Sequence, residues 1–213
     1  MQIIRFKKID STQNYAKKIA EKSGSGTIVL AEKQTGGRGQ FERGWSSSKG
    51  GLYFSIILKP RPFSGTFQKE RGKPKIDTPD RIIRGQAPRY PAQIPELTLK
   101  MADAIIDALK IKKPKIFINP PNDIMIRTRD EGRGMRNKKI AGILTESSVT
   151  CNKIDWIVVG VGVNINNKIP KELEKIAVSL KEITKKNGNV KKIFKEIIKK
   201  FVSTNRIDFS GKF

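Results

Sequence analysis

Four polar, glycine-containing segments of this chain carry residue types from which a site for anionic ligands can be built. The first runs from Gln34 to Trp45 and places closely spaced glycines next to Arg38 and Arg43. Such glycines let backbone amides turn toward an anion, and arginine adds a permanent fork of donors. Trp45 offers a flat face for a ring. The loop also fits a flexible turn or an RNA-binding segment, and it lacks the G-K-[ST] ending of a Walker loop.

The other three segments are shorter and each alone also fits an ordinary structural role. In residues 137–146, Lys139 begins an apolar strand in which Gly142 leaves room for a ligand beside the backbone. Asn122 and Asp123 follow two prolines in a turn that leads into a strand. Residues 159–166 end an apolar strand in glycines and amides, and strand ends of this kind often form binding crevices.

The chain contains no histidine and one cysteine, Cys151. This composition excludes histidine-dependent acid–base or nucleophilic chemistry, histidine-ligated zinc and a thiolate metal cage. An enzyme of this composition works through lysine, arginine, carboxylates, amides and backbone donors. That set suits phosphoryl or adenylyl transfer, where positioning and charge neutralisation provide most of the catalysis.

The formal net charge is +24 over 213 residues, which fit one domain. Such a charge attracts polyanions, whether nucleic acid, nucleotide phosphates or an acidic protein, but it also fits a solvated lysine-rich surface. No apolar run is long enough for a membrane span, and there is no cysteine pair. The first residues have neither the long apolar run nor the small-residue cleavage site of a secretory signal. We expect a cytoplasmic protein without a membrane partner.

Hydrophobic patterning predicts an α+β fold with a mixed, largely antiparallel sheet, because helices and strands do not alternate as βαβ units. Strands are expected at residues 2–9, 27–32, 52–58, 115–118, 123–126, 139–146 and 154–163, the last nearly all apolar and therefore central. Helices are expected from Ser11 to Lys22, at residues 96–109, from Ser179 to Lys186 and at residues 193–202. Seven of the eleven prolines fall in residues 59–95, which we expect to be a long irregular loop, and residues 127–137 are expected to form a charged hairpin tip.

The order of the segments resembles the catalytic domain of biotin–protein ligases. That family has an Asp-Ser-Thr-Asn helix start, a Gly-Arg-Gly-Arg loop ending in Trp and a Lys-Trp-Pro-Asn-Asp turn. A Lys-x-Ala-Gly-Ile-Leu strand and a Gly-x-Gly-x-Asn strand end follow. The corresponding stretches here are residues 11–13, 37–45, 119–123, 139–144 and 160–164, and the resemblance covers about Ile3 to Phe201 outside residues 60–95. It implies a class II synthetase-like fold that activates biotin with ATP to biotinyl-5'-AMP and attaches it to a lysine of a biotin carboxyl carrier protein.

The resemblance also implies residue roles. Ser11, Thr12 and Gln34 would bind the ureido ring of biotin. The rest of the biotin site would comprise Gly37, Arg38, Lys139, Gly142 and Leu144. The ATP and adenylate site would comprise Arg38, Gly39, Gln40, Arg43, Trp45, Asn122, Asp123, Lys139 and Asn164. Lys139, Arg38 and Asp123 would be catalytic, and Mg²⁺ would enter with ATP near Asp123 without a metal site made by the protein alone.

The sequence departs from the family pattern at residues where charge matters. Gln40 stands at the second arginine of Gly-Arg-Gly-Arg, Asn119 and Pro120 stand at the Lys-Trp of the turn, and Gln13 stands at the Asn of the helix start. Each lost cation should cost about 1–3 kcal/mol of adenylate binding if its hydrogen bond is desolvated. We therefore expect an enzyme that releases biotinyl-AMP readily.

Three other functions stay open. A lipoate–protein ligase would share the fold, although that family's motif contains a histidine that this chain lacks. A non-catalytic homologue could bind biotin or the carrier only. A nucleic-acid-binding module would explain the charge but not the ordered motifs. We expect residues 1–213 to form a single catalytic domain without an N-terminal helix-turn-helix or a complete C-terminal β domain. We also expect no specific nucleic acid partner, and an exposed edge strand that could serve homodimerisation or carrier docking.

Overall fold

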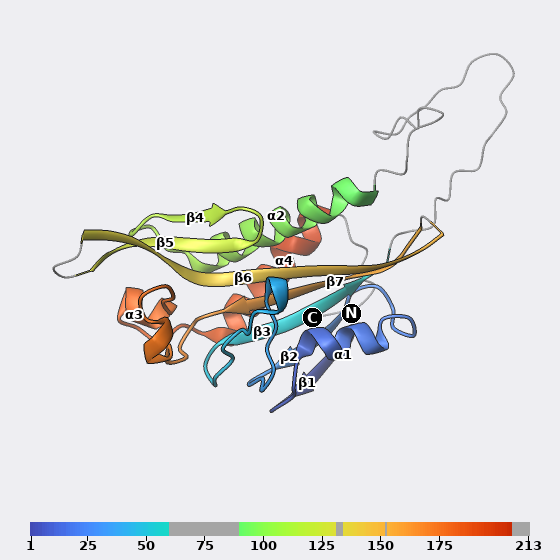
Figure 1. Cartoon of the computed structure of the whole chain (residues 1–213), viewed down its shortest axis with the longest axis horizontal. Helices are drawn as coiled ribbons and strands as arrows, with labels where there is room; N and C mark the ends of the chain where they lie inside the picture. The colour runs from blue at the N-terminus through green and yellow to red at the C-terminus, as the bar shows by residue number, and fades with distance from the viewer. Residues whose placement is uncertain (60–89, 131–133, 152, 206–213) are drawn as a thin grey trace, which may run out of the picture.

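The computed structural model describes residues 1–59, 90–130, 134–151 and 153–205 (Figure 1). Within these residues a seven-stranded sheet has the order β1-β2-β3-β7-β6-β5-β4. The strands are β1 (Ile3–Phe6), β2 (Thr27–Ala31), β3 (Leu52–Leu58), β4 (Ile116–Asn119), β5 (Asp123–Asp130), β6 (Gly134–Thr150) and β7 (Lys153–Val163). β1 and β2 are parallel and the other neighbours are antiparallel, which confirms the expected mixed sheet. The apolar strand β7 is central, as predicted.

Helices cover both faces of the sheet (Figure 1). The helices are α1 (Thr12–Ile19), α2 (Tyr90–Leu109), α3 (Leu180–Thr184) and α4 (Val190–Asn205), with short 3-10 turns η1 (Gln40–Glu42) and η2 (Lys171–Leu173). On one face, Ala16 and Ala20 of α1 pack against Val29, Ile57 and Val158 of the sheet. On the other face, α2 and α4 enclose the larger core.

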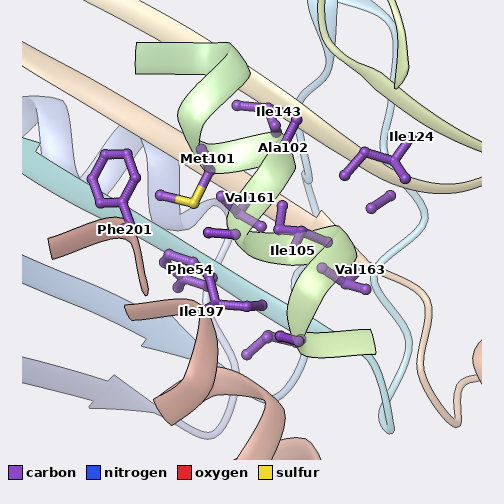
Figure 2. Close-up of a cluster of buried hydrophobic side chains, with 14 of the residues drawn as sticks. Phe54, Met101, Ala102, Ile105, Ile124, Ile143, Val161, Val163, Ile197 and Phe201 are labelled. Atoms are coloured by element: carbon purple, nitrogen blue, oxygen red, sulfur yellow. The ribbon is translucent and has the colours of Figure 1, made fainter. Parts of the chain in front are cut away.

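Figure 2 shows that larger core. Met101 and Ile105 of α2 and Phe201 of α4 are fully buried there with Phe54 of β3 and Val163 of β7. Burial of each such side chain contributes about 1.5–3 kcal/mol to folding. Because β3 is buried along its whole length, its sequence is a continuous apolar run rather than an alternating one. A polar residue in that run, Ser55, therefore needs partners inside the fold.

The predicted helix starts at Ser11 and Ser179 are confirmed. Ser11 is the N-cap of α1 and its side chain accepts a hydrogen bond from the Asn14 backbone. Ser179 and Glu182 form a complete capping box at the start of α3. The cap of α1 fixes the direction in which Ser11 and Thr12 enter the site, because both are buried at the first turn of the helix.

The expected irregular loop at residues 59–95 is wrong for its last part, because α2 begins at Tyr90. The prediction ended the loop too late because prolines usually interrupt helices. A proline in the first turn of a helix loses no intrahelical hydrogen bond, and only Pro95 forgoes one. The expectation for residues 60–89 lies outside the described residues.

The expected hairpin tip at residues 127–137 is also wrong in extent. β5 continues to Asp130 and β6 begins at Gly134, with Arg127 paired to Asn137 and Arg129 to Met135. The charged residues of this stretch favour a loop in a sequence pattern. A solvent-exposed pair of strands, however, is held by cross-strand backbone hydrogen bonds and needs no apolar face. Residues 131–133, where the chain reverses, lie outside the described residues.

Smaller differences concern element ends. β1 stops at Phe6 rather than Ile9, which forms only an isolated bridge with Gln34, and α1 stops at Ile19 rather than Lys22. β6 continues four residues past the expected Glu146 to Thr150. Among the described helices, none is both long and apolar enough to cross a membrane.

Candidate functional site

The pairing of β3, β7 and β6 aligns small residues in rows on the face that α1 covers. Ser55 is paired with Gly160, which is paired with Leu144. One row along, Gly162 is paired with Gly142. A Cβ at Gly162 would collide with the Trp45 indole nitrogen, and one at Gly142 would lie 3.0 Å from the Trp45 ring. Because neither glycine has a side chain, the two leave a slot above the strands, and the flat indole ring of Trp45 lies in it.

A β-bulge brings Lys139 to this face. β5 residues Ile124 and Met125 pair with Ala141 and Lys139, so Ile140 is the extra residue of β6. In a regular strand Lys139, three residues from Gly142, would point to the opposite face, since successive side chains alternate; the bulge at Ile140 returns it to the face of Gly142. Ile140 itself is fully buried, and the Lys139 ammonium would lie 3.2 Å from a Cβ at Gly142.

The end of the slot next to α1 is polar. Gln34 Oε1 accepts hydrogen bonds from the Thr12 backbone N–H at 2.7 Å and from Thr12 Oγ1 at 3.0 Å. Ser55 Oγ lies 3.0 Å from both Thr12 Oγ1 and Gln13 Oε1. A hydroxyl has one proton, so Ser55 can donate to only one of these two acceptors. This end can exchange hydrogen bonds with a ligand that presents both N–H and C=O groups.

A second polar network leads from this end to Arg38. Gln13 Nε2 donates to Glu146 Oε2 at 2.8 Å, and Lys17 Nζ lies 2.7 Å from Glu146 Oε1. Burial by itself raises the pKa of Glu146, but hydrogen bonds from Lys17 and Gln13 and the charges of Lys17 and Arg38 outweigh it and lower that pKa. Arg38 donates to Asn14 Oδ1 at 3.0 Å and lies 3.9 Å from Glu146.

Trp45 fills the glycine-floored slot in this structure. The remaining cavity has a volume of about 40 Å³, which admits a few waters and no bicyclic ring. Lys139 Nζ stands 5.1 Å from the centroid of the indole ring. Within the described residues the buried Nε1 of Trp45 has no hydrogen-bond partner, a situation that costs about 1–3 kcal/mol. The indole therefore occupies the slot at a cost that a better-matched ligand would relieve.

A larger cavity of about 350 Å³ adjoins the slot and shares Trp45 and Lys139 with it. This volume is in the range of ordinary ligand pockets. One wall is the loop that contains Phe41 and Arg43, the other is the segment from Ile169 to Ala177, and Asp123 lies in the wall from β5. Asn122, at the junction, is 8% exposed and donates to the Ile143 carbonyl at 3.0 Å.

The structure brings nearly all the expected site residues to these two connected cavities. The slot is lined by Ser11, Thr12, Gln34, Arg38, Gly142 and Leu144, the larger cavity by Arg43, Asp123 and Asn164, and both by Gly39, Gln40, Trp45, Asn122 and Lys139. Gly37 lines neither; it packs against the Trp45 carbonyl and Ser47, where a Cβ has no space. Arg38 lines the slot, but its guanidinium is bound to α1 and Glu146 rather than placed beside Lys139.

Sequence reasoning missed two parts of the site. Ser55 forms the base of the polar end, and the one available signal was a serine inside an apolar strand. Residues 169–177 form a wall of the larger cavity, held by the Lys139 backbone N–H, which donates to the Ile176 carbonyl at 2.7 Å. That segment carries two lysines and two glutamates and has no regular apolar period, so nothing in its sequence indicated a role in the site.

Comparisons with known proteins agree with this geometry. A family model described as the biotin/lipoate A/B protein ligase family matches residues 5–69. The bifunctional ligase/repressor BirA of Bacillus subtilis is 32% identical over 180 residues, 82% of this chain and 44% of the relative. A biotin--[acetyl-CoA-carboxylase] ligase of Paracoccus denitrificans is 27% identical over 159 residues, 73% of this chain and 51% of the relative. The chain thus spans about half the length, or less, of these two relatives.

A solved structure matches nearly the whole chain. Biotin protein ligase from Aquifex aeolicus, in complex with biotin and ATP, superposes with a TM-score of 0.67 at 28% identity, over 96% of this chain and 70% of that one. The sheet, its flanking helices and the slot thus define a ligase-type catalytic fold. Residues 5–69 match the biotin/lipoate A/B protein ligase family, and the similarity to a bifunctional ligase/repressor BirA extends over 82% of the chain. Within that family its similarity is to the biotin–protein ligases.

Proposed function

We propose that the chain activates biotin with ATP and transfers the biotinyl group to a lysine of a carrier protein. The observation that carries the proposal is the position of Lys139 at the junction of the glycine-floored slot and the larger cavity. A neutral bicyclic ring system suits the slot, whose polar end supplies directional hydrogen bonds. A nucleotide suits the larger cavity, so a carboxylate from one side and an α-phosphate from the other would meet at Lys139.

The chemistry needs no nucleophile from the protein. A biotin carboxylate oxygen attacks the α-phosphorus of ATP, forms the biotinyl-5'-AMP anhydride and expels pyrophosphate. The amine of the carrier lysine then attacks the biotinyl carbonyl carbon, loses a proton as the amide forms, and AMP leaves. Bringing two anions together is the difficult part, and a fixed ammonium lowers that barrier most. Lys139 supplies this charge.

Mg²⁺ fits this site only together with ATP. Among the described residues no group of three acidic, histidine or cysteine side chains could hold a metal ion. Asp123 lines the larger cavity and offers one carboxylate, and Mg²⁺ is usually bound by one or two carboxylates plus substrate phosphates. The Asp123 carboxylate lies 2.6 Å from Lys139 Nζ, and it would exchange this contact for one with the metal. The metal would also supply positive charge to the phosphates.

The carrier is proposed to be a biotin carboxyl carrier protein or domain, in line with the name of the Paracoccus denitrificans relative. We place the reaction in the cytoplasm, where ATP and carboxylases meet. The test is to incubate the chain with biotin, ATP and Mg²⁺ and to measure pyrophosphate release with and without an acidic carrier domain. Lipoate in place of biotin is the matched control. Release that does not depend on biotin, or that lipoate supports equally well, would refute the proposal.

A further inference from the structure

The last four residues of β5 and the first five of β6 form a two-stranded arm that projects from the sheet. We call residues 127–130 and 134–138 the basic arm. β4 accompanies β5 only as far as Ile126, and the β7 partners of β6 end at Ala141. Within the described residues the arm therefore has no third strand on either side. In Figure 1 the arm extends past the start of β4, toward the left of the molecule.

The strand register fixes which side chains share the face of the active site. Met125 and Lys139, paired across β5 and β6, both line the larger cavity. Continuing in steps of two, the pairs Arg127 with Asn137 and Arg129 with Met135 lie on that same face. The intervening Ile126 is fully buried in the core on the other face, which confirms the alternation.

This face of the basic arm is exposed and positively charged. Arg127 and Arg129 are both exposed, and neither guanidinium has a hydrogen bond or an ion pair to the part of the chain that the structure describes. Met135 beside them is 53% exposed. Two uncompensated arginines next to an exposed apolar side chain have the composition of an interface, in which arginine and methionine are enriched.

The outer end of the basic arm lies away from the larger cavity. Arg129 is four residues beyond Met125, or about 13 Å along the strand. A ligand that contacts both the cavity wall at Met125 and the Arg129 end of the arm spans about that distance, which suits a macromolecule.

We propose that the basic arm docks an acidic face of the carrier protein while the carrier lysine enters the larger cavity. This inference rests on the proposed function, which requires a protein to approach that cavity. The arm carries no aromatic side chain on which bases could stack. Its exposed methionine and its place beside the cavity instead suit a folded protein surface, and the net charge of +24 attracts an acidic one.

The test compares two double charge reversals of equal size. R127E/R129E changes the basic arm, and K191E/K192E makes the same change at two exposed lysines of α4. Each variant and the wild-type chain are measured for affinity toward an acidic biotin carboxyl carrier domain, for carrier labelling, and for biotin-dependent pyrophosphate release without carrier. The neutral variant R127Q/R129Q shows whether loss of charge suffices. A 20-base-pair DNA duplex serves as the nucleic acid probe.

R127E/R129E should weaken carrier binding and lower kcat/KM for carrier labelling by about tenfold or more at low ionic strength, and high salt should reduce the difference. R127Q/R129Q should show a smaller loss, K191E/K192E less than about a twofold loss, and all three should retain pyrophosphate release. Equal losses in both charge reversals would overturn the proposal in favour of bulk charge. Unchanged carrier binding in R127E/R129E would also overturn it, as would loss of DNA binding alone. Absence of pyrophosphate release in the wild type would instead refute the proposed function, while carrier binding would still test the arm.

Discussion

Lys139 and Asp123 form an ion pair, with 2.6 Å between Nζ and Oδ1, where the slot meets the larger cavity. The contact does not have the angles of a hydrogen bond, so it is electrostatic. The two side chains are 29% and 26% exposed, and a pair with that much solvent contact contributes about 1 kcal/mol or less. A bound carboxylate or phosphate can therefore replace Asp123 as the partner of Lys139.

If Lys139 is the cation that neutralises the two substrates, Lys139→Met should reduce biotin-dependent pyrophosphate release by about 10²–10³-fold, since the charge acts in the transition state. The substitution keeps the length of the side chain and removes the ammonium alone. Lys153→Met, at the exposed start of β7, is the control and should retain full activity. The measurement is the initial rate at saturating ATP, and turnover above a tenth of wild type would contradict the role.

Biotin should move the Trp45 indole out of the slot, because the slot does not hold both. The sequence has two tryptophans, Trp45 and Trp156, so a Trp156→Phe background isolates the first. In that background, biotin without ATP should shift the emission of Trp45 toward the red as the ring leaves its apolar surroundings. Trp45→Ala should bind biotin faster because no side chain must leave. An emission spectrum that saturating biotin leaves unchanged would show that the ligand binds elsewhere.

Gln40→Arg should slow the release of biotinyl-AMP. Gln40 lines both cavities, so an arginine there can reach the adenylate. One charged hydrogen bond of about 1–3 kcal/mol corresponds to about 5- to 150-fold slower release. Single-turnover chase experiments measure this rate. Gln2→Arg adds the same charge at an exposed site and should have no effect. Tight retention in wild type, with no gain from Gln40→Arg, would disprove the expectation of a leaky enzyme.

Glu146 should make folding stability depend on pH. Its pKa is lowered in the folded chain, so its contribution is present above the unfolded carboxyl value of about 4.3 and is lost as the pH falls through the lower folded pKa. Glu146→Gln should lower the urea midpoint at pH 7 and lose that disadvantage progressively below pH about 4. Glu21→Gln, at an exposed residue, is the matched control. A deficit of the same size at pH 3 and pH 7 would rule out the ionised carboxylate as its source.

The sequence predicted those parts of the site that depend on local chemistry. Local signals predicted the helix start at Ser11 and a strand through Lys139, whereas the site roles of Ser11, Thr12 and Lys139 were implied by the family resemblance. What could not be predicted depends on register. The bulge at Ile140 leaves no mark in the sequence, yet it decides which face Lys139 occupies.

The same limit explains the two largest errors of extent. Charged residues favour a loop in a short-range pattern, so the predicted strands stopped before the basic arm. Prolines favour the end of a helix, so the predicted start of α2 was too late. The family resemblance implied a role for Trp45 on the adenylate side. The position of its ring over both Gly142 and Gly162 depends on the pairing of β6 with β7.

The central position of β7 has a consequence for how the protein is made. The glycines of the slot lie on β7 and β6, and β7 pairs with β3, which precedes it by about a hundred residues. Contacts so distant along the chain form slowly, because a long loop must close first. While β7 is still inside the ribosome, the nascent chain already has the capped start of α1 and the loop that contains Arg38. It does not yet have the paired Gly142 and Gly162 on which the slot is built. The ability to bind its ligand should therefore appear abruptly and late in synthesis.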